Sequence, residues 1–416
     1  MSGAALAGRF AAIGARIDAL SHRALFAWVV FPLLVLYLAT ATWSGGYHID
    51  PFTNNLSAWS LGTRGTLLLD DHVALATPEY FSNIAWVVPA RDSAASQYAP
   101  GTAIYGAPFY AIWPQDAELR LMHGVVPGVP DIEILVPPVA PAAIAAALAV
   151  AFAMGFLALT FRRFTGPRLA LGAAYVAGLG TTAWSVAADA LWQHGPGMMW
   201  IALGLALCVD HLVSSGFAFG AAVLTRPHTA LIPAATGIYQ SIKRRSLRPA
   251  LWIGLGSSAG LAALLAINDR VFGEPSISGG YPSSFRERAL SLDIPHFLWN
   301  VLGALFGPLH GLLIWSPFLI VLIPGLRAAW RAAPGWVKGA SLGGVLYLLL
   351  QLKANRYTGG GGFAAYRYPL EALTAAAPLL LLAYTEWVAK RPRAARIFSF
   401  TVKASICIQA VYALVF

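Results

Sequence analysis

Long apolar runs alternate with short polar connectors along most of the chain. The first run, 24–43, carries no charge, and at about 1.5 Å per residue a helix of that length crosses a bilayer. The run at 216–241 contains Pro227, so we expect two short helices there with a hinge at Leu224–His228. Further apolar segments cover 135–160, 169–188, 196–212, 249–267, 312–326, 339–352, 370–388 and 402–416. The pattern predicts an all-α polytopic membrane protein with about eleven spans.

The composition supports the membrane assignment. Hydrophobic residues make up 58% of the chain and charged residues 11%, whereas soluble domains are about 25% charged. The net charge of +10 comes from basic residues clustered in short connectors, which is typical of cytoplasmic loops and not of a nucleic-acid surface. Cys208 and Cys407 lie in apolar runs far apart, so neither a disulfide framework nor a metal motif is indicated.

Charge also predicts which side of the membrane each connector faces. The spacing of arginines and small apolar residues in segment 1–23 predicts a cytoplasmic interfacial helix. The apolar run after it is too long for the core of a signal peptide, so a retained first span is favoured. The other basic connectors, which we also place in the cytoplasm, are 161–168, 243–248, 327–338 and 390–396. The long loop 44–134 then lies outside. We expect one membrane-embedded domain over 1–416, with no separate soluble domain.

The long outer loop begins with an acidic cluster. Asp50, Asp70 and Asp71 stand here, although the whole chain has only 18 acidic residues. The stretch 51–65 predicts an amphipathic juxtamembrane helix. Its apolar face consists of Phe52, Leu56 and Trp59. Asp50 is then either a catalytic base held at the membrane surface or simply the N-cap of this helix.

Two further features have residues suited to a substrate. Tyr98 opens the turn "YAPG", and the apolar, aromatic helix expected after it either lines a lipid-facing groove or is an ordinary interfacial helix. Later, four consecutive glycines stand between Arg356 and Arg367, and exposed amides beside arginines suit a phosphate group. The alternative is that both arginines are snorkelling interfacial side chains. Arg226, in the predicted hinge, is a third cation that would otherwise lie in lipid.

A metal cofactor is not expected. The histidines in predicted outer segments are His194, His228 and His310. They lack metal-ligand spacing, so hydrogen bonding to a headgroup or a neighbouring loop is the simpler role. Asp70 and Asp71 are adjacent, and adjacent side chains diverge by about 100° on a helix, which argues against a shared metal.

The order of these stretches resembles the GT-C superfamily of polytopic glycosyltransferases, in particular bacterial members that use polyprenyl-phosphate-linked sugars. The likeness covers nearly the whole chain and rests on order and topology, with an acid after the first span and "YAPG" where many members have Tyr-Pro-Pro-Gly. Ala99 departs from that pattern. The later segments that resemble the group are "LWQHGP", "LTRP", "FGPLHGLLIWSP" and "GGGGFAAYRYPLE". The chain is similar to actinobacterial members that build cell-wall arabinan or mannan.

The resemblance implies a GT-C-like bundle in a bacterial plasma membrane, with an extracytoplasmic active site. It implies inverting transfer of a sugar from a polyprenyl-phosphate donor to a glycan or lipoglycan acceptor, with an Asp general base. The candidate bases are Asp50, which leads, Asp70 and Asp71. The candidates for binding the donor phosphate are Arg367, which leads, Arg356 and Arg226. The candidate substrate-binding residues are His48, Asn54, Tyr98, His194, His228, His310 and Tyr366.

Two other functions remain open. A transporter or flippase of lipid-linked sugars would need polar residues near the midplane, often in inverted repeats with broken helices. The chain has one broken-helix candidate, at 216–241, without a matched partner. A non-enzymatic assembly subunit would leave the outer acids and arginines without a role. Because the polar residues collect at one predicted face, an enzyme is favoured over both.

Overall fold

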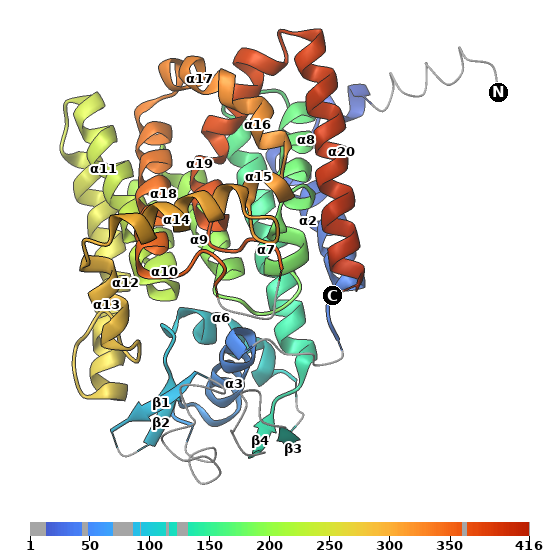
Figure 1. The fold of residues 1–416 in the computed structure, drawn as a ribbon. Coiled ribbons are helices and arrows are strands. Elements are labelled where there is room, and N and C mark those ends of the chain that lie inside the picture. The colour runs from blue at the N-terminus through green and yellow to red at the C-terminus, as the bar shows by residue number, and fades with distance from the viewer. Residues whose placement is uncertain are drawn as a thin grey trace.

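Helices dominate the structure, and most of them stand side by side in one bundle (Figure 1). The computed structural model describes residues 14–43, 49–69, 86–91, 93–113, 116–122, 132–359 and 364–415. The longer helices are α2 (His22–Thr40), α3 (Ile49–Arg64), α6 (Gly101–Ala111), α7 (Val139–Phe161), α8 (Pro167–Leu179), α9 (His194–Leu207), α10 (Leu212–Thr225), α11 (Leu231–Arg244), α12 (Arg248–Phe272), α14 (Ile294–Phe306), α18 (Gly335–Ala354), α19 (Leu370–Ala383) and α20 (Pro392–Val415). The shorter elements are α13 (Ser283–Leu290), α15 (Leu312–Trp315), α16 (Phe318–Leu322), α17 (Leu326–Ala332), the 3-10 turns η2 (Pro227–Ala230) and η3 (Ile323–Gly325), and the π-helical turns η1 (Ala183–Ala187) and η4 (Tyr384–Val388).

Four helices in the described part of the chain are long and apolar enough to cross a bilayer, namely α2, α7, α12 and α20. Together α13 and α14 pass the same test but bend by 99° at their junction, so they could form a fifth span. The expected eleven spans are not confirmed. Helices α9, α10 and α11 have 14 residues each, which gives about 21 Å against a hydrocarbon core of about 30 Å. The chain is therefore a helical, membrane-embedded protein in which shorter helices pack between the long ones.

The two ends of the bundle differ in charge and in structure. Basic connectors gather at the end that carries α17, where Phe164 stacks on Trp336 at 5.7 Å and Lys243 lies beside Gly335 (Figure 1). The opposite end is covered by a layer made of α3, α6 and two antiparallel strand pairs. The pairs are β1 (Val87–Ala90) with β2 (Ser93–Ser96) and β3 (Glu118–Met122) with β4 (Ile132–Val136). We call this covering the α3–α6 layer; its helices were expected in the long loop, whereas the strand pairs were not.

Helix α3 is held by the apolar face that its sequence predicts. Phe52, Leu56 and Trp59 are 3%, 1% and 5% exposed and pack in one cluster with Leu191, from the loop before α9. The amphipathic helix predicted here is thus confirmed. Asp50 lies inside the first turn of α3 and is not its N-cap. The helix therefore presents Asp50 at the edge of the layer, next to the bundle.

The chain breaks between α10 and α11, where the sequence predicts a hinge. Helix α10 ends at Thr225, Arg226 is extended (φ −146°, ψ 102°), and Pro227 opens the single turn η2. Proline has no amide hydrogen, so it cannot continue the hydrogen-bond ladder of α10. The prediction of two short helices is confirmed, and the residue at the break, Arg226, is buried.

Glycines let α10 and α12 pack backbone against backbone. Gly216 and Gly220 on α10 meet Gly256 and Gly260 on α12, and the spacing of four residues puts each pair on one helix face. A Cβ on Gly260 would lie 2.0 Å from the carbonyl oxygen of Gly220. No larger side chain fits there unless the helices separate. This contact fixes the end of α10 and hence the position of Arg226.

Replacing Gly260 with valine should destabilise the protein, because the new side chain would push α12 away from α10. Overpacking of this kind costs about 1–3 kcal/mol, so the thermal unfolding midpoint of the purified protein in detergent should fall by several degrees. The matched control is Gly254→Val on the same helix, since a Cβ at Gly254 meets no atom within 4 Å. Equal midpoints for the two variants would contradict the close contact between the helices.

Candidate functional site

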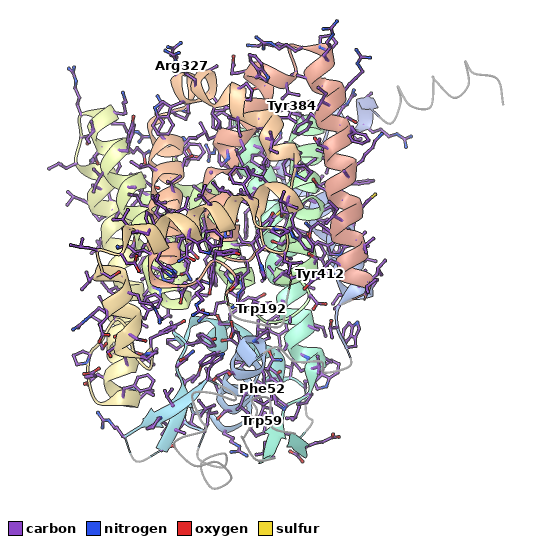
Figure 2. The ribbon with its side chains drawn as sticks, viewed as in Figure 1. Phe52, Trp59, Trp192, Arg327, Tyr384 and Tyr412 are labelled. Atoms are coloured by element: carbon purple, nitrogen blue, oxygen red, sulfur yellow. The ribbon has the colours of Figure 1, made fainter. Side chains whose placement is uncertain are left out.

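The leading base candidate and the leading phosphate candidate form an ion pair. Arg367 donates from Nη1 to Oδ2 of Asp50 and from Nη2 to the carbonyl oxygen of Gly359. Its guanidinium carbon also lies 4.6 Å from the ring centre of Trp192 and 5.3 Å from that of Tyr368. Trp192 marks the junction of the bundle and the α3–α6 layer (Figure 2). The fold thus brings together two residues that are 317 positions apart.

Tyr98 completes the surroundings of Asp50. Its hydroxyl donates to the Asp50 carboxylate, and its ring packs edge-on against Tyr281 with centroids 5.8 Å apart. Burial, together with the adjacent carboxylate, raises the pKa of Tyr98 well above its ordinary value, so this hydroxyl remains a protonated donor. Gly101 lets the turn approach α10 closely, because a Cβ there would lie 2.4 Å from the backbone nitrogen of Thr225. The "YAPG" turn therefore links Asp50 to the hinge.

The carboxylate that pairs with Arg226 is a residue that the sequence analysis missed. Glu371, in the first turn of α19, is 0% exposed. Its Oε1 and Oε2 lie 2.9 Å and 3.0 Å from Nδ1 of His194, and Oε1 lies 3.4 Å from Nε of Arg226. A carboxylate at this depth has to be paired. The sequence does contain a signal for Glu371, since it is an acidic residue at the start of the apolar segment 370–388. Ionisable residues inside a membrane are rarely without function.

Arg226 connects this carboxylate to α18 and to a second histidine. Its Nη2 donates to Oε1 of Gln351 at 3.2 Å and lies 3.4 Å from Nε2 of His228. The His228 ring stacks on Tyr347, with centroids 4.8 Å apart and planes 6° apart. Arg226 and His228, both from the predicted hinge, are therefore held against α18, which follows them in the chain by more than a hundred positions.

Both arginines lie near one aromatic ring. The guanidinium carbon of Arg226 lies 6.0 Å from the ring centre of Tyr368, and that of Arg367 lies 5.3 Å from the same centre. Each arginine has its own carboxylate, Glu371 for the first and Asp50 for the second. The formal charges of these four groups cancel. We call Asp50, Arg226, Arg367, Glu371 and the side chains in contact with them the charged cluster.

Two predicted substrate-binding residues tie elements together. Asn54 donates from Nδ2 to the carbonyl oxygen of Leu191 at 3.0 Å, which fixes α3 to the loop before α9. The Tyr366 hydroxyl shares a 2.8 Å hydrogen bond with Ser316, in the turn between α15 and α16. Both residues are 2% exposed. These contacts give Asn54 and Tyr366 a structural role at the border of the cluster.

The remaining predicted residues are an exposed arginine, a histidine packed against a tyrosine, and three residues outside the described ranges. Arg356 is exposed, and His310 packs edge-on against Tyr357 with centroids 6.0 Å apart. The predicted residues outside the described ranges are His48, Asp70 and Asp71. Of the three candidate bases, the structure therefore positions Asp50 alone. Of the three arginines, it brings Arg367 and Arg226 together.

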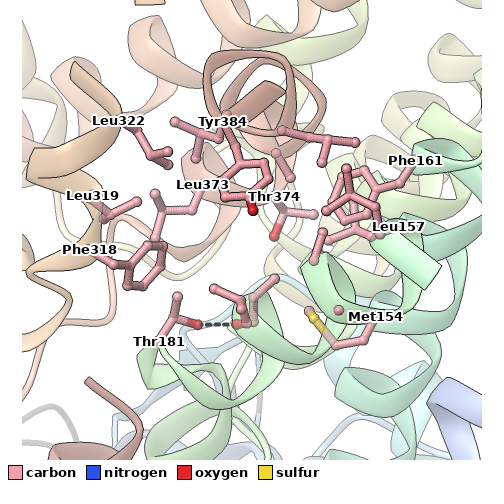
Figure 3. A pocket seen from close by; sticks show the side chains of 18 of the residues that line it. Met154, Leu157, Phe161, Thr181, Phe318, Leu319, Leu322, Leu373, Thr374 and Tyr384 are labelled. Carbon is pink, nitrogen blue, oxygen red and sulfur yellow. Dashed lines mark hydrogen bonds between the residues drawn. The ribbon is translucent and has the colours of Figure 1, made fainter. Parts of the chain in front are cut away.

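An apolar cavity of about 260 Å³ lies between α7, α8, α16, α19 and α20 (Figure 3). The hydroxyl groups among its lining residues are those of Thr181, Thr374 and Tyr384. Leu370 lines this cavity, whereas the next residue, Glu371, contacts His194. Helix α19 therefore separates the cavity from the charged cluster. With no charged group in its lining, the cavity suits an apolar chain and not proton transfer.

The charged cluster has the groups needed to take a proton from a hydroxyl beside a bound anion. Asp50 is a carboxylate with 23% side-chain exposure that pairs with Arg367, and both Arg367 and Arg226 lie near the ring of Tyr368. Such cations stabilise the charge that develops on a leaving phosphate. Within the described ranges, no three His, Cys, Asp or Glu side chains are arranged to hold a metal ion.

Glu371→Gln should destabilise the protein strongly, because the amide leaves Arg226 buried without its anion. Removing one partner of a buried pair costs about 3–5 kcal/mol. Thermal unfolding in detergent measures this loss. The matched control is Glu386→Gln, which breaks a 2.6 Å pair with Lys390 at 33% and 59% exposure. Such surface pairs contribute about 0–1 kcal/mol, so a Glu371 variant no less stable than the control would contradict the buried pairing.

Compared with protein-family models, with curated proteins and with solved structures, the chain gives no match. The resemblance to GT-C enzymes thus gains no support from these comparisons and meets no contradiction in them. The function has to be inferred from the position and chemistry of the charged cluster.

Proposed function

We propose that the protein is a membrane glycosyltransferase that moves a sugar from a polyprenyl-phosphate donor to an extracytoplasmic glycan or lipoglycan acceptor. The observation that carries the proposal is the meeting of Asp50, a partly exposed carboxylate, with Arg367 and a second arginine at one end of the bundle. A general base beside phosphate-binding cations is what this transfer requires. The resemblance of the chain to actinobacterial cell-wall enzymes favours arabinofuranose or mannose as the sugar.

The position of the cluster in the bundle supports a reaction near one membrane surface. Helix α9 begins at His194 and α19 at Leu370, whereas α10 ends at Thr225 and α18 at Ala354. The cluster therefore lies at helix ends, away from the basic connectors. If those connectors are cytoplasmic, the cluster faces the extracytoplasmic side, where a lipid-linked donor can meet a glycan.

The proposed step is an in-line displacement at the anomeric carbon. Asp50 removes the proton of the acceptor hydroxyl while the acceptor oxygen bonds to the anomeric carbon. The bond from that carbon to the phosphate oxygen breaks, and its electron pair stays on the phosphate. Arg367 and Arg226 stabilise the charge that develops there. A lipid phosphate is already a good leaving group, so no general acid is needed.

A transporter or flippase of lipid-linked sugars is the second candidate, and one observation favours it. The break between α10 and α11 places buried Arg226 between two short helices, as broken helices do in many transporters. Against it, the charged groups gather at helix ends on the side of the bundle opposite the basic connectors. In proteoliposomes a transporter would move the labelled lipid between leaflets without releasing polyprenyl phosphate.

The first test is to incubate the purified protein with a panel of radiolabelled polyprenyl-phospho-sugars and an acceptor glycan. We expect one donor to be consumed, with the label moving to the acceptor and polyprenyl phosphate released. If no donor is turned over while labelled lipid crosses the vesicle bilayer, the transferase proposal fails and the transporter replaces it.

Asp50→Asn should abolish transfer, a loss of at least about a hundredfold, because the amide cannot accept the proton. The protein should still elute as a single species in detergent. Asp210→Asn is the matched control, since Asp210 pairs with Arg163 at the basic end and its loss should leave transfer unchanged. Full activity of the Asp50 variant would move the base to Asp70 or Asp71.

A further inference from the structure

The two arginines of the cluster hold their carboxylates in different ways. In the pair of Arg226 with Glu371, the side chains are 6% and 0% exposed, and Glu371 also contacts His194. In the pair of Arg367 with Asp50, the arginine is 7% exposed and the aspartate 23%. Asp50 is therefore the one accessible group among these four charges. The first pair is closed, whereas a ligand can reach the second from the aspartate side.

Both members of the accessible pair have other contacts that would keep them in place if the pair opened. Arg367 also bonds the carbonyl oxygen of Gly359 and lies over the rings of Trp192 and Tyr368. The loop backbone comes this close because Gly359 has φ +72°, and a Cβ there would lie 2.7 Å from Nε of Arg367. Asp50 is held by its helix and by the Tyr98 hydroxyl. If the pair opens, each side chain therefore keeps other contacts that hold it close to its present position.

We propose that the donor phosphate replaces Asp50 on Arg367, and that this exchange releases Asp50 to act as the base. This inference rests on the proposed function. While Oδ2 of Asp50 accepts a hydrogen bond from Arg367, the lone pair used in that bond is not available to an acceptor hydroxyl. A phosphodiester has two non-bridging oxygens that match the forked guanidinium. Donor binding therefore switches the site from a closed ion pair to a free base beside a bound phosphate.

The charges balance through the whole cycle. The two arginines and two carboxylates sum to zero, and the donor brings one negative charge. During transfer, the proton of the acceptor moves to Asp50 and the electron pair of the broken bond moves to the phosphate, so the total stays at one negative charge. When the lipid phosphate leaves, Asp50 gives its proton to solvent and pairs with Arg367 again.

The exchange is tested by binding, without any sugar transfer. Farnesyl monophosphate is titrated into the full-length protein in detergent and the heat is measured. Asp50→Asn removes the carboxylate that competes for Arg367. The variant should therefore bind this probe about tenfold more tightly than the wild type does, because the loss of one competing hydrogen bond to a charged group corresponds to about a tenfold change in affinity. If Asp50 merely holds Arg367 in place, the same variant should bind more weakly, and that result would overturn the proposal.

Three controls make the result specific. Asp189→Asn removes a nearby aspartate whose carboxylate bonds Thr42, and it should leave the affinity unchanged; an equal gain there would overturn the exchange. Arg367→Gln should weaken binding by at least tenfold, and undiminished binding would likewise overturn it. Farnesol, which lacks the phosphate, should bind equally to all variants. If Asp50→Asn does not yield a single folded species, Asp50→Ser makes the same test.

Two further arms separate this inference from its premises. On Asp50→Asn, the affinity for inorganic phosphate should rise less than the affinity for farnesyl monophosphate. A rise in affinity that is confined to inorganic phosphate would overturn the lipid assignment. Tighter binding by Asp50→Asn, in a protein that transfers no sugar, would support the anion exchange and reject the transferase. Weaker binding in a protein that does transfer sugar would reject the exchange alone.

Discussion

The ion pair of Asp50 with Arg367 joins the α3–α6 layer to the helical bundle, and the arrangement of the site depends on it. A guanidinium that is only 7% exposed has to be matched by acceptors and an anion. Arg367 comes from the loop before α19, and the required carboxylate comes from α3, which its own apolar face holds in the layer. Packing of α3 therefore positions the charge, and the charge fixes α3 against the bundle.

The second pair, of Glu371 with Arg226, indicates function more than stability. A buried ion pair is often no more stabilising than apolar side chains of the same volume, although it is costly to break. Within the bundle, apolar residues would fill this space without the need to bury two charges. The presence of Glu371 and Arg226 beside His194, at the same end as Asp50, is accounted for if the cluster binds or transfers charged groups. The aromatic ring of Tyr368, which lies near both arginines, is consistent with this role.

The sequence predicted the local features of the site better than the pairings between distant segments. Helix α3 and the break at Pro227 follow from periodicity and from the chemistry of proline, which act over a few residues. Arg356 and Arg367 both flank the glycine run, and only the family resemblance ranked Arg367 first, yet the fold exposes one and buries the other. Glu371 was missed because its partners lie in α9 and at the end of α10. The short lengths of α9, α10 and α11 likewise depend on packing, so the count of eleven spans from apolar runs is not confirmed.

The asymmetry between the two pairs explains how a neutral, buried cluster could accept an anion. An added charge at low dielectric is costly unless a cation is already in place to receive it. Closed pairing of both arginines would exclude the ligand, and two unpaired arginines would be costly to bury. One closed and one accessible pair avoids both problems. In the proposed transfer, negative charge then moves from Asp50 to a phosphate already beside Arg367, so the reaction relocates charge within the cluster and creates none.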